Sequence, residues 1–195
     1  TQKFAMTPTL FRDRNRPETF IVVPRVSSEN RPYIPFGFFD KNSIVSDTCM
    51  SIPLGNKFHF GVLMSTMHMA WVKTTCGRLK SDFRYSKDIV YNNYPWPENP
   101  TEKQVQLIEE KAQNVLDVRA SFPNSSLADL YNPLTMPPAL VKAHNELDKA
   151  VDAAYSKQNF STEAKRMEFL FELYEKYTAD LFVKEKPKKT KKTGK

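Results

Sequence analysis

The residues best equipped for chemistry lie in one stretch, from Gly77 to Pro97, which reads GRLKSDFRYSKDIVYNNYPWP. Its first half mixes cations with hydroxyl groups and an aromatic ring: Arg78, Lys80, Ser81, Arg84, Tyr85 and Ser86. Arginine offers a planar fork of N–H donors, lysine a mobile point charge, and serine a neutral donor. Such side chains suit contacts to a phosphate backbone and to base edges. Because a solvated surface turn has the same composition, the rest of the chain has to decide between the two.

Formal charge divides the chain into three segments. Residues 1–97 carry +6, residues 98–183 carry −5, and residues 184–195 carry +6. A basic first part followed by an acidic second part favours a protein in which only the first part faces nucleic acid. The lysine-rich tail of residues 184–195 is expected to be disordered, and it suits non-specific DNA attraction and solubility equally well.

Residues that could catalyse a reaction by themselves are scattered. The chain has no Walker A, GxGxxG, GxSxG or HExxH motif, and His59, His68 and His144 lie far apart. Cys49 and Cys76 lack CxxC spacing, so they are expected to be packing residues in a reducing cytoplasm. No apolar run is long enough to cross a membrane, and no signal peptide is recognisable.

Two further features near the motif do not define an active site. Asp82 and Asp88 are expected to orient Arg78 or Arg84, or to repel non-specific phosphate. Tyr91 to Pro97 has a superficial likeness to the NPPY loop of amino-methyltransferases, but its tyrosine precedes its single proline. We therefore interpret this segment as a strand end followed by a proline-stiffened linker.

The pattern of apolar residues predicts an α+β fold in which a strand-rich part containing one packed helix precedes an all-α part. Strands are expected within Thr19 to Pro24, Tyr33 to Phe39 and Ser43 to Pro53. One helix from about Lys57 to Thr74 has apolar residues at helical spacing, and Gly77 would stop it.

After Pro97 the pattern predicts helices. Thr101 and Gln104 have the spacing of a capping box. A short turn is expected from Ser126 to Tyr131, and another helix after Pro137. The last helix, from about Ser161 to Phe182, has a wide apolar face and is expected to pack between other helices.

These motifs together resemble the C-terminal region of MmeI-like DNA methyltransferases, which are single-chain type II restriction–modification enzymes and their methyltransferase-only relatives. The likeness rests on GRLKSDFRYS, YNNYPWP and DLYNPLTMPP in this order. It implies a DNA target-recognition domain at residues 1–97, which need not include its first strands, and a helical domain at residues 98–183.

The resemblance also implies a function. The parent enzyme would transfer a methyl group from S-adenosylmethionine to adenine N6, whereas this chain has no cofactor site and would not catalyse the reaction in isolation. Its partners would be double-stranded DNA and the methyltransferase domain of the same parent chain. It would not bind a membrane. The six polar residues of the motif would hold the DNA backbone. Base reading would fall to Arg25 to Arg31, including Asn30, and to Lys41 to Asp47.

A second hypothesis comes from the acidic helical half. Its wide apolar face could dock the methyltransferase domain or a partner subunit, which would make the chain a protein-interaction module. The two roles are compatible.

Overall fold

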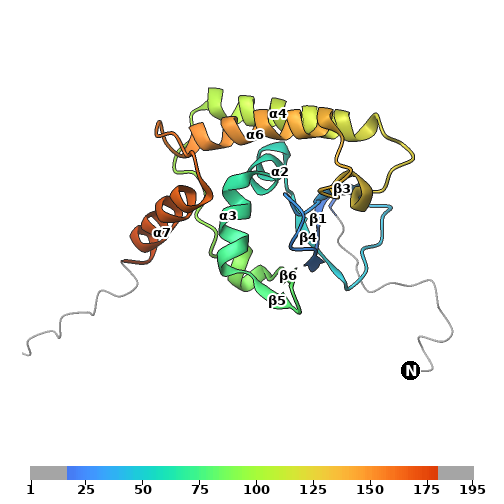
Figure 1. Cartoon of the computed structure of the whole chain (residues 1–195), viewed down its shortest axis with the longest axis horizontal. Coiled ribbons are helices and arrows are strands. Elements are labelled where there is room, and N and C mark those ends of the chain that lie inside the picture. The colour runs from blue at the N-terminus through green and yellow to red at the C-terminus, as the bar shows by residue number, and fades with distance from the viewer. Residues whose placement is uncertain (1–16, 180–195) are drawn as a thin grey trace, which may run out of the picture.

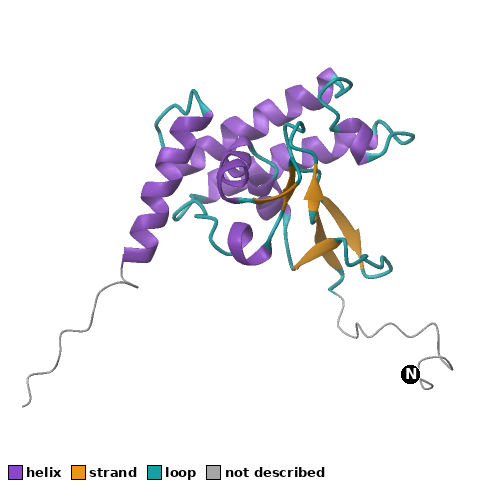
Figure 2. Ribbon diagram, turned by 60° about the horizontal axis from the view of Figure 1, so that its bottom comes forward, coloured by secondary structure: helices purple, strands orange, loops and turns teal. Residues whose placement is uncertain are grey.

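The computed structural model describes residues 17–179, so the basic tail and the expected helix end at Phe182 lie outside it. Strands gather on one side of the molecule and helices on the other (Figure 2). The α+β class predicted from the sequence is confirmed. No helix in the described part of the chain is long and apolar enough to cross a membrane.

The first sheet has three antiparallel strands in the order β3-β1-β4. They span Thr19–Pro24 (β1), Gly37–Asp40 (β3) and Cys49–Pro53 (β4). Ile21 of the central strand lies opposite Phe38 and Ile52 and is fully buried. Of the strand expected within Tyr33 to Phe39, only the part from Gly37 onward is a strand. Pro35 has no N–H to donate to a strand ladder, which explains why the strand begins after it.

The second sheet contains the motif that begins at Gly77. Its strands, in the order β2-β6-β5, span Val26–Ser27 (β2), Gly77–Leu79 (β5) and Asp82–Arg84 (β6). A single π-helical turn, η1, follows at Lys87–Tyr91. The segment is thus a β-hairpin and a helical turn. The interpretation of Tyr91 as a strand end was wrong, because Tyr91 ends η1 instead.

The single helix predicted from Lys57 to Thr74 is two helices, α2 (Lys57–Leu63) and α3 (Thr66–Thr75). Ser65 breaks them because its backbone is extended and its hydroxyl caps α3 by accepting from the His68 N–H. The apolar stripe continues across the break, which is why periodicity alone missed it. Figure 1 shows α2 beneath α4 and α6, and α3 running from there alongside the sheets to the hairpin, on the side that faces α7.

The remaining helices span Glu102–Ala120 (α4), Leu127–Leu130 (α5), Pro138–Tyr155 (α6) and Glu163–Ala179 (α7). The capping box of Thr101 and Gln104 is formed as predicted. Helix α7 contacts α3 and the end of α6, but Phe171 and Tyr177 remain partly exposed. Helix α7 therefore packs against other helices on only part of its surface, whereas the sequence predicted that it would lie between them.

One hydrophobic core runs through both halves of the chain. Gly61 of α2 shows how closely the halves approach: an added Cβ would lie 2.7 Å from Ile108 Cγ2 and 3.3 Å from Ala112 Cβ, both on α4. Helix α2 of the strand-rich half is thus packed directly against α4, while α3, which leads into the hairpin β5–β6, packs against α6 and α7.

Candidate nucleic-acid interface

A groove of about 810 Å³, here called the basic groove, opens between β4 and the hairpin β5–β6. The residues lining it are Val23, Arg25, Met50, Ser51, Ile52, Pro53, Gly77, Arg78, Arg84, Tyr85, Ser86, Lys87, Asp88, Ile89 and Tyr91. Five of the nine predicted contact residues are among them. Residues far apart in the sequence therefore converge on one surface.

Arg25 and Arg84 are the two cations of the groove that form no ion pair within residues 17–179, whereas Arg78 is paired with Glu29 and Lys87 with Asp88. The Arg25 backbone carbonyl accepts from the Tyr85 N–H at 2.8 Å, and its guanidinium donates to the Asp47 carbonyl at 2.8 Å. Arg84 is exposed and lies opposite Val26 in the ladder. Within residues 17–179 neither arginine forms an ion pair with a carboxylate, so both charges are available to an anionic ligand.

Arg78 has a different role, because its guanidinium is already engaged. It forms an ion pair with Glu29 at 3.3 Å, donates to the Ser81 carbonyl at 2.9 Å, and lies 4.2 Å above the Phe83 ring. These contacts brace the hairpin from within. The carboxylate that orients Arg78 is thus Glu29, whereas the sequence had favoured Asp82 and Asp88.

Lys80 and Ser81 form the turn of the hairpin and do not line the groove. Lys80 has a φ of 56°, in the left-handed region, and its side chain is exposed. Leu79, just before it, is half exposed. The turn therefore projects its side chains into solvent. Figure 1 shows the hairpin at the edge of the molecule opposite α4 and α6.

Tyr85 was predicted to contact DNA, but it belongs to the core. It is 2% exposed, and its hydroxyl lies 3.0 Å from Nε2 of the buried His68. Burial raises the pKa of Tyr85 well above its ordinary value and lowers the pKa of His68 to about 3. Tyr85 thus supports its neighbours Arg84 and Ser86 from the core, and only a small part of it reaches the groove that it lines.

Asn30 and Arg31 do not join the basic groove. They line a separate cleft beside the turn Asn132–Leu134 of the helical half. The Arg31 guanidinium makes one long hydrogen bond, of 3.5 Å, to the Ser27 hydroxyl. The predicted contact residues are therefore divided between two surfaces.

Comparison with known families covers almost the whole chain. Residues 1–98 match the family model described as MmeI, target recognition domain, and residues 100–182 match MmeI, C-terminal domain. The chain belongs to the MmeI family. The resemblance inferred from GRLKSDFRYS, YNNYPWP and DLYNPLTMPP is thus confirmed.

Two relatives of this MmeI-family chain are informative. DNA methyltransferase A of Bacillus subtilis (strain 168) is 44% identical over 179 residues, which is 91% of this chain and 20% of that protein. A solved structure of the type IIL restriction–modification enzyme MmeI in complex with DNA is 46% identical, with a TM-score of 0.82. It covers 91% of this chain and 24% of the MmeI chain. The chain therefore spans about a quarter or less of each relative.

Some residues of the groove escaped the sequence analysis. Lys87 and Ile89 lie on η1, beside Ser86, whose hydroxyl accepts from the Ile89 N–H. Both are exposed. Lys87 directly follows the GRLKSDFRYS segment, so its charge was a usable signal. Nothing local marks Ile89 as exposed, since its exposure follows from the π-helical turn.

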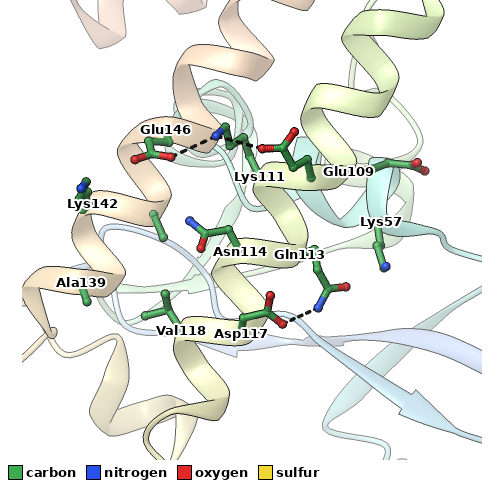
Figure 3. A pocket seen from close by; sticks show the side chains of 12 residues that line it. Lys57, Glu109, Lys111, Gln113, Asn114, Asp117, Val118, Ala139, Lys142 and Glu146 are labelled. Carbon is green, nitrogen blue, oxygen red and sulfur yellow. Dashed lines mark hydrogen bonds and ion pairs between the residues drawn. The ribbon is translucent and has the colours of Figure 1, made fainter.

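A second depression in this MmeI-family chain lies between α4 and α6 and has mixed charge (Figure 3). Lys111 lies 3.3 Å from the carboxylates of both Glu110 and Glu146. The carboxylates that line this depression would repel phosphate, so the depression is a poor DNA site. No group of residues within 17–179 has the composition and spacing to hold a metal ion.

Proposed function

We propose that this chain is the DNA-recognition module of an adenine-N6 methyltransferase of the restriction–modification type, and that it binds duplex DNA without catalysing methyl transfer itself. The observation that carries the proposal is the basic groove, in which Arg25 and Arg84 form no ion pair within residues 17–179 and lie beside a projecting hairpin. Phosphate contacts of this kind give affinity and fix the register of a protein on DNA.

The hairpin β5–β6 suits sequence reading by its shape. A two-stranded ribbon fits the major groove of B-form DNA, where base edges are distinguishable. Lys80 and Ser81 lie at its exposed turn, and the braced Arg78 stiffens it. The groove beside it would then hold the DNA backbone. Support also comes from the MmeI–DNA complex, which shares this fold.

S-adenosylmethionine and the catalytic residues belong, in this proposal, to the rest of the parent chain. The chain covers only 20% of the Bacillus subtilis relative, so most of such an enzyme lies elsewhere. Its four glycines within residues 17–179 are isolated from one another, which does not suit a glycine-rich nucleotide loop. The methyltransferase domain of the same parent is the expected neighbour.

The proposal is tested by the salt dependence of binding. Fluorescence anisotropy with a random-sequence 30-base-pair duplex, from about 50 to 200 mM salt, should give a steep linear fall in log affinity. Arg84→Ala should reduce the slope by about 0.9, which is one phosphate contact. Lys142→Ala, an exposed cation in the α4–α6 depression, is the matched control and should leave the slope unchanged.

Equal slopes for wild type and Arg84→Ala, or no binding by the wild type, would refute DNA recognition through this groove. The adenine-N6 assignment is tested separately. The full parent enzyme, given labelled S-adenosylmethionine and duplex DNA, should place the label on adenine N6. Label on cytosine would overturn that part alone.

The α4–α6 depression favours a second, compatible role in protein docking. Its alternating charges, including Lys57, Lys142 and Glu109, suit a polar protein surface better than a polyanion. Charge reversal by Lys142→Glu should weaken assembly with a separately expressed methyltransferase part, measured by light scattering. Unchanged assembly would remove this role and leave DNA recognition standing.

A further inference from the structure

Three large apolar side chains are exposed at the end of the first sheet where β1 begins, and we call them the apolar patch. They are Phe39 of β3, Ile44 in the turn after β3, and Leu54 directly after β4, with exposed fractions of 43%, 57% and 83%. The ladder brings β3 and β4 to this end, because Phe20 of β1 lies opposite both Phe39 and Pro53. Exposed apolar side chains that gather in this way mark a docking surface.

Leu54 is held outward at a conformational cost. Its φ of 58° lies in the left-handed region, which is unfavourable for a residue with a Cβ. The residues after it fix the turn: a Cβ added to Gly55 would lie 2.6 Å from Cδ1 of the buried Ile21, and Asn56 caps α2 by accepting from the His59 N–H. Strain that presents an apolar side chain to solvent points to a partner for that side chain.

The chain itself has an apolar segment within reach of the patch. Residues 1–16 lie outside the described part and connect to β1 through Pro17 and Glu18. Lys41, in the turn after β3, holds Glu18 at this end of the sheet through an ion pair of 2.9 Å and a backbone hydrogen bond of 3.2 Å. Phe11 precedes Glu18 by seven residues, which extend to at most about 25 Å. The large apolar side chains of this segment are Phe4, Met6, Leu10 and Phe11.

Two arguments favour this segment over a separate protein as the occupant of the patch. The family model of the target recognition domain matches residues 1–98, so the segment and the first sheet belong to the same domain. A segment tethered beside the patch also has a much higher effective concentration than a separate partner, so it needs less apolar contact to remain bound.

Docking of the segment would also place charge. Arg12, Arg14 and Arg16 follow its last apolar residue and precede β1. With the apolar residues bound on one side and β1 fixed on the other, these arginines would be confined to this end of the first sheet. The basic groove reaches the same end, since Pro53 lines it.

We infer that residues 4–11 dock on the apolar patch and thereby hold Arg12, Arg14 and Arg16 beside the basic groove, where they add to the contact with DNA. The docking is independent of the proposed function, whereas the DNA contact rests on it.

Carbene footprinting of the full chain, read by mass spectrometry, tests the docking. Leu54 should be labelled about fivefold less than Leu134, which is 91% exposed on the helical half and serves as the matched reference. Combined substitution of Phe4, Leu10 and Phe11 by serine, here called the triple-serine variant, should raise labelling of Leu54 to the level of Leu134. Equal labelling of the two leucines in the wild type overturns the inference. So does protection of Leu54 that disappears on dilution together with a dimer in light scattering, because a second copy would then cover the patch.

Leu54→Asn gives a second test, in which the sign of the effect decides. Asparagine tolerates the left-handed backbone, so on an uncovered patch the substitution should raise the thermal midpoint by about 1–3 °C. Under a docked segment it should instead lower the midpoint by about 2–4 °C, because it removes a buried apolar contact. We expect the lower midpoint in the wild-type background and the higher one in the triple-serine background. A higher midpoint in both backgrounds overturns the docking.

Binding to the random-sequence duplex tests the DNA part. The triple-serine variant keeps every charge but no longer confines the three arginines, so its affinity at a fixed salt concentration should fall about fivefold. Unchanged affinity would overturn the DNA part and leave the docking. Arg84→Ala in the same assay reports on the proposed function: if it leaves the salt slope unchanged, recognition through the basic groove fails, while the footprint of Leu54 still decides the docking.

Discussion

The Tyr85 hydroxyl donates a hydrogen bond of 3.0 Å to Nε2 of His68. The direction follows from the other ring nitrogen. Nδ1 lies 2.8 Å from the Leu63 carbonyl, which only accepts, so Nδ1 carries the proton and Nε2 is the acceptor. This bond ties the segment between β6 and η1 to the start of α3. It makes Tyr85 the internal support of a surface on which its neighbours act.

The substitution Tyr85→Phe distinguishes a structural role of Tyr85 from a direct contact with DNA. It leaves Nε2 of His68 without a donor, so the free energy of unfolding should fall by about 1–2 kcal/mol in urea titrations. The affinity for DNA at a fixed salt concentration should stay at the wild-type value. A reduced affinity with unchanged stability would instead show that Tyr85 contacts DNA directly.

A second buried link joins the two halves of the chain through Arg119 of α4. Its guanidinium donates to the Phe36 carbonyl at 2.7 Å and to the Tyr131 hydroxyl at 2.8 Å. Arg119→Met should lower the free energy of unfolding by about 3 kcal/mol, since it leaves these buried acceptors unpaired. Tyr131→Phe leaves the buried guanidinium and Nε2 of His144 without this hydroxyl, so it should cost about 2–3 kcal/mol.

The halves should also unfold in one transition, because Arg119 and the shared core couple them. Urea unfolding followed by tryptophan fluorescence and by far-ultraviolet circular dichroism provides the check. Two separated transitions would show that the strand-rich half and the helical half are independent folding units.

These two links show which parts of the structure local sequence can predict. Thr101 and Gln104 predict the N-terminus of a helix, because a capping box involves residues only three apart in the sequence. The burial of Arg119 depends on Phe36, which lies 83 residues away, and no local pattern marks it. Tyr85 misled for the same reason: it lies among surface cations, but its partner is on another helix. The cations of the groove were recoverable, whereas their division between two surfaces required the fold.

Buried histidines should make the protein sensitive to acid. Burial lowers the pKa of His68 and of His144 to about 3. Each histidine has a lower pKa in the folded protein than in the unfolded chain, where it is about 6.5. The folded state is therefore favoured above about pH 6.5, and the free energy of unfolding decreases as the pH falls below that value. Asp148 opposes the trend, because burial raises its pKa to about 6. Its contribution is present at low pH and is lost as the pH rises through that value.

Two histidines outweigh one aspartate, so the free energy of unfolding should fall by roughly 2–3 kcal/mol from about pH 7 to about pH 5. Urea midpoints across this range measure the change. His144→Gln should flatten the dependence, and Asp148→Asn should steepen it. A midpoint that rises toward pH 5 would contradict the assignment of neutral buried histidines.

Substitutions of Lys80 should show that this residue favours DNA binding at a cost to the stability of the hairpin turn. Its φ of 56° is costly for a side chain bearing a Cβ and free of cost for glycine. Lys80→Gly should therefore raise the free energy of unfolding by about 0.5 kcal/mol, while reducing the salt slope of DNA binding by about 0.9. Lys80→Asn, which tolerates the same backbone, should lose as much slope and gain less stability. If Lys80→Gly gains stability and binds DNA as the wild type does, the strain at position 80 serves the turn alone, and the hairpin enters no groove through this residue.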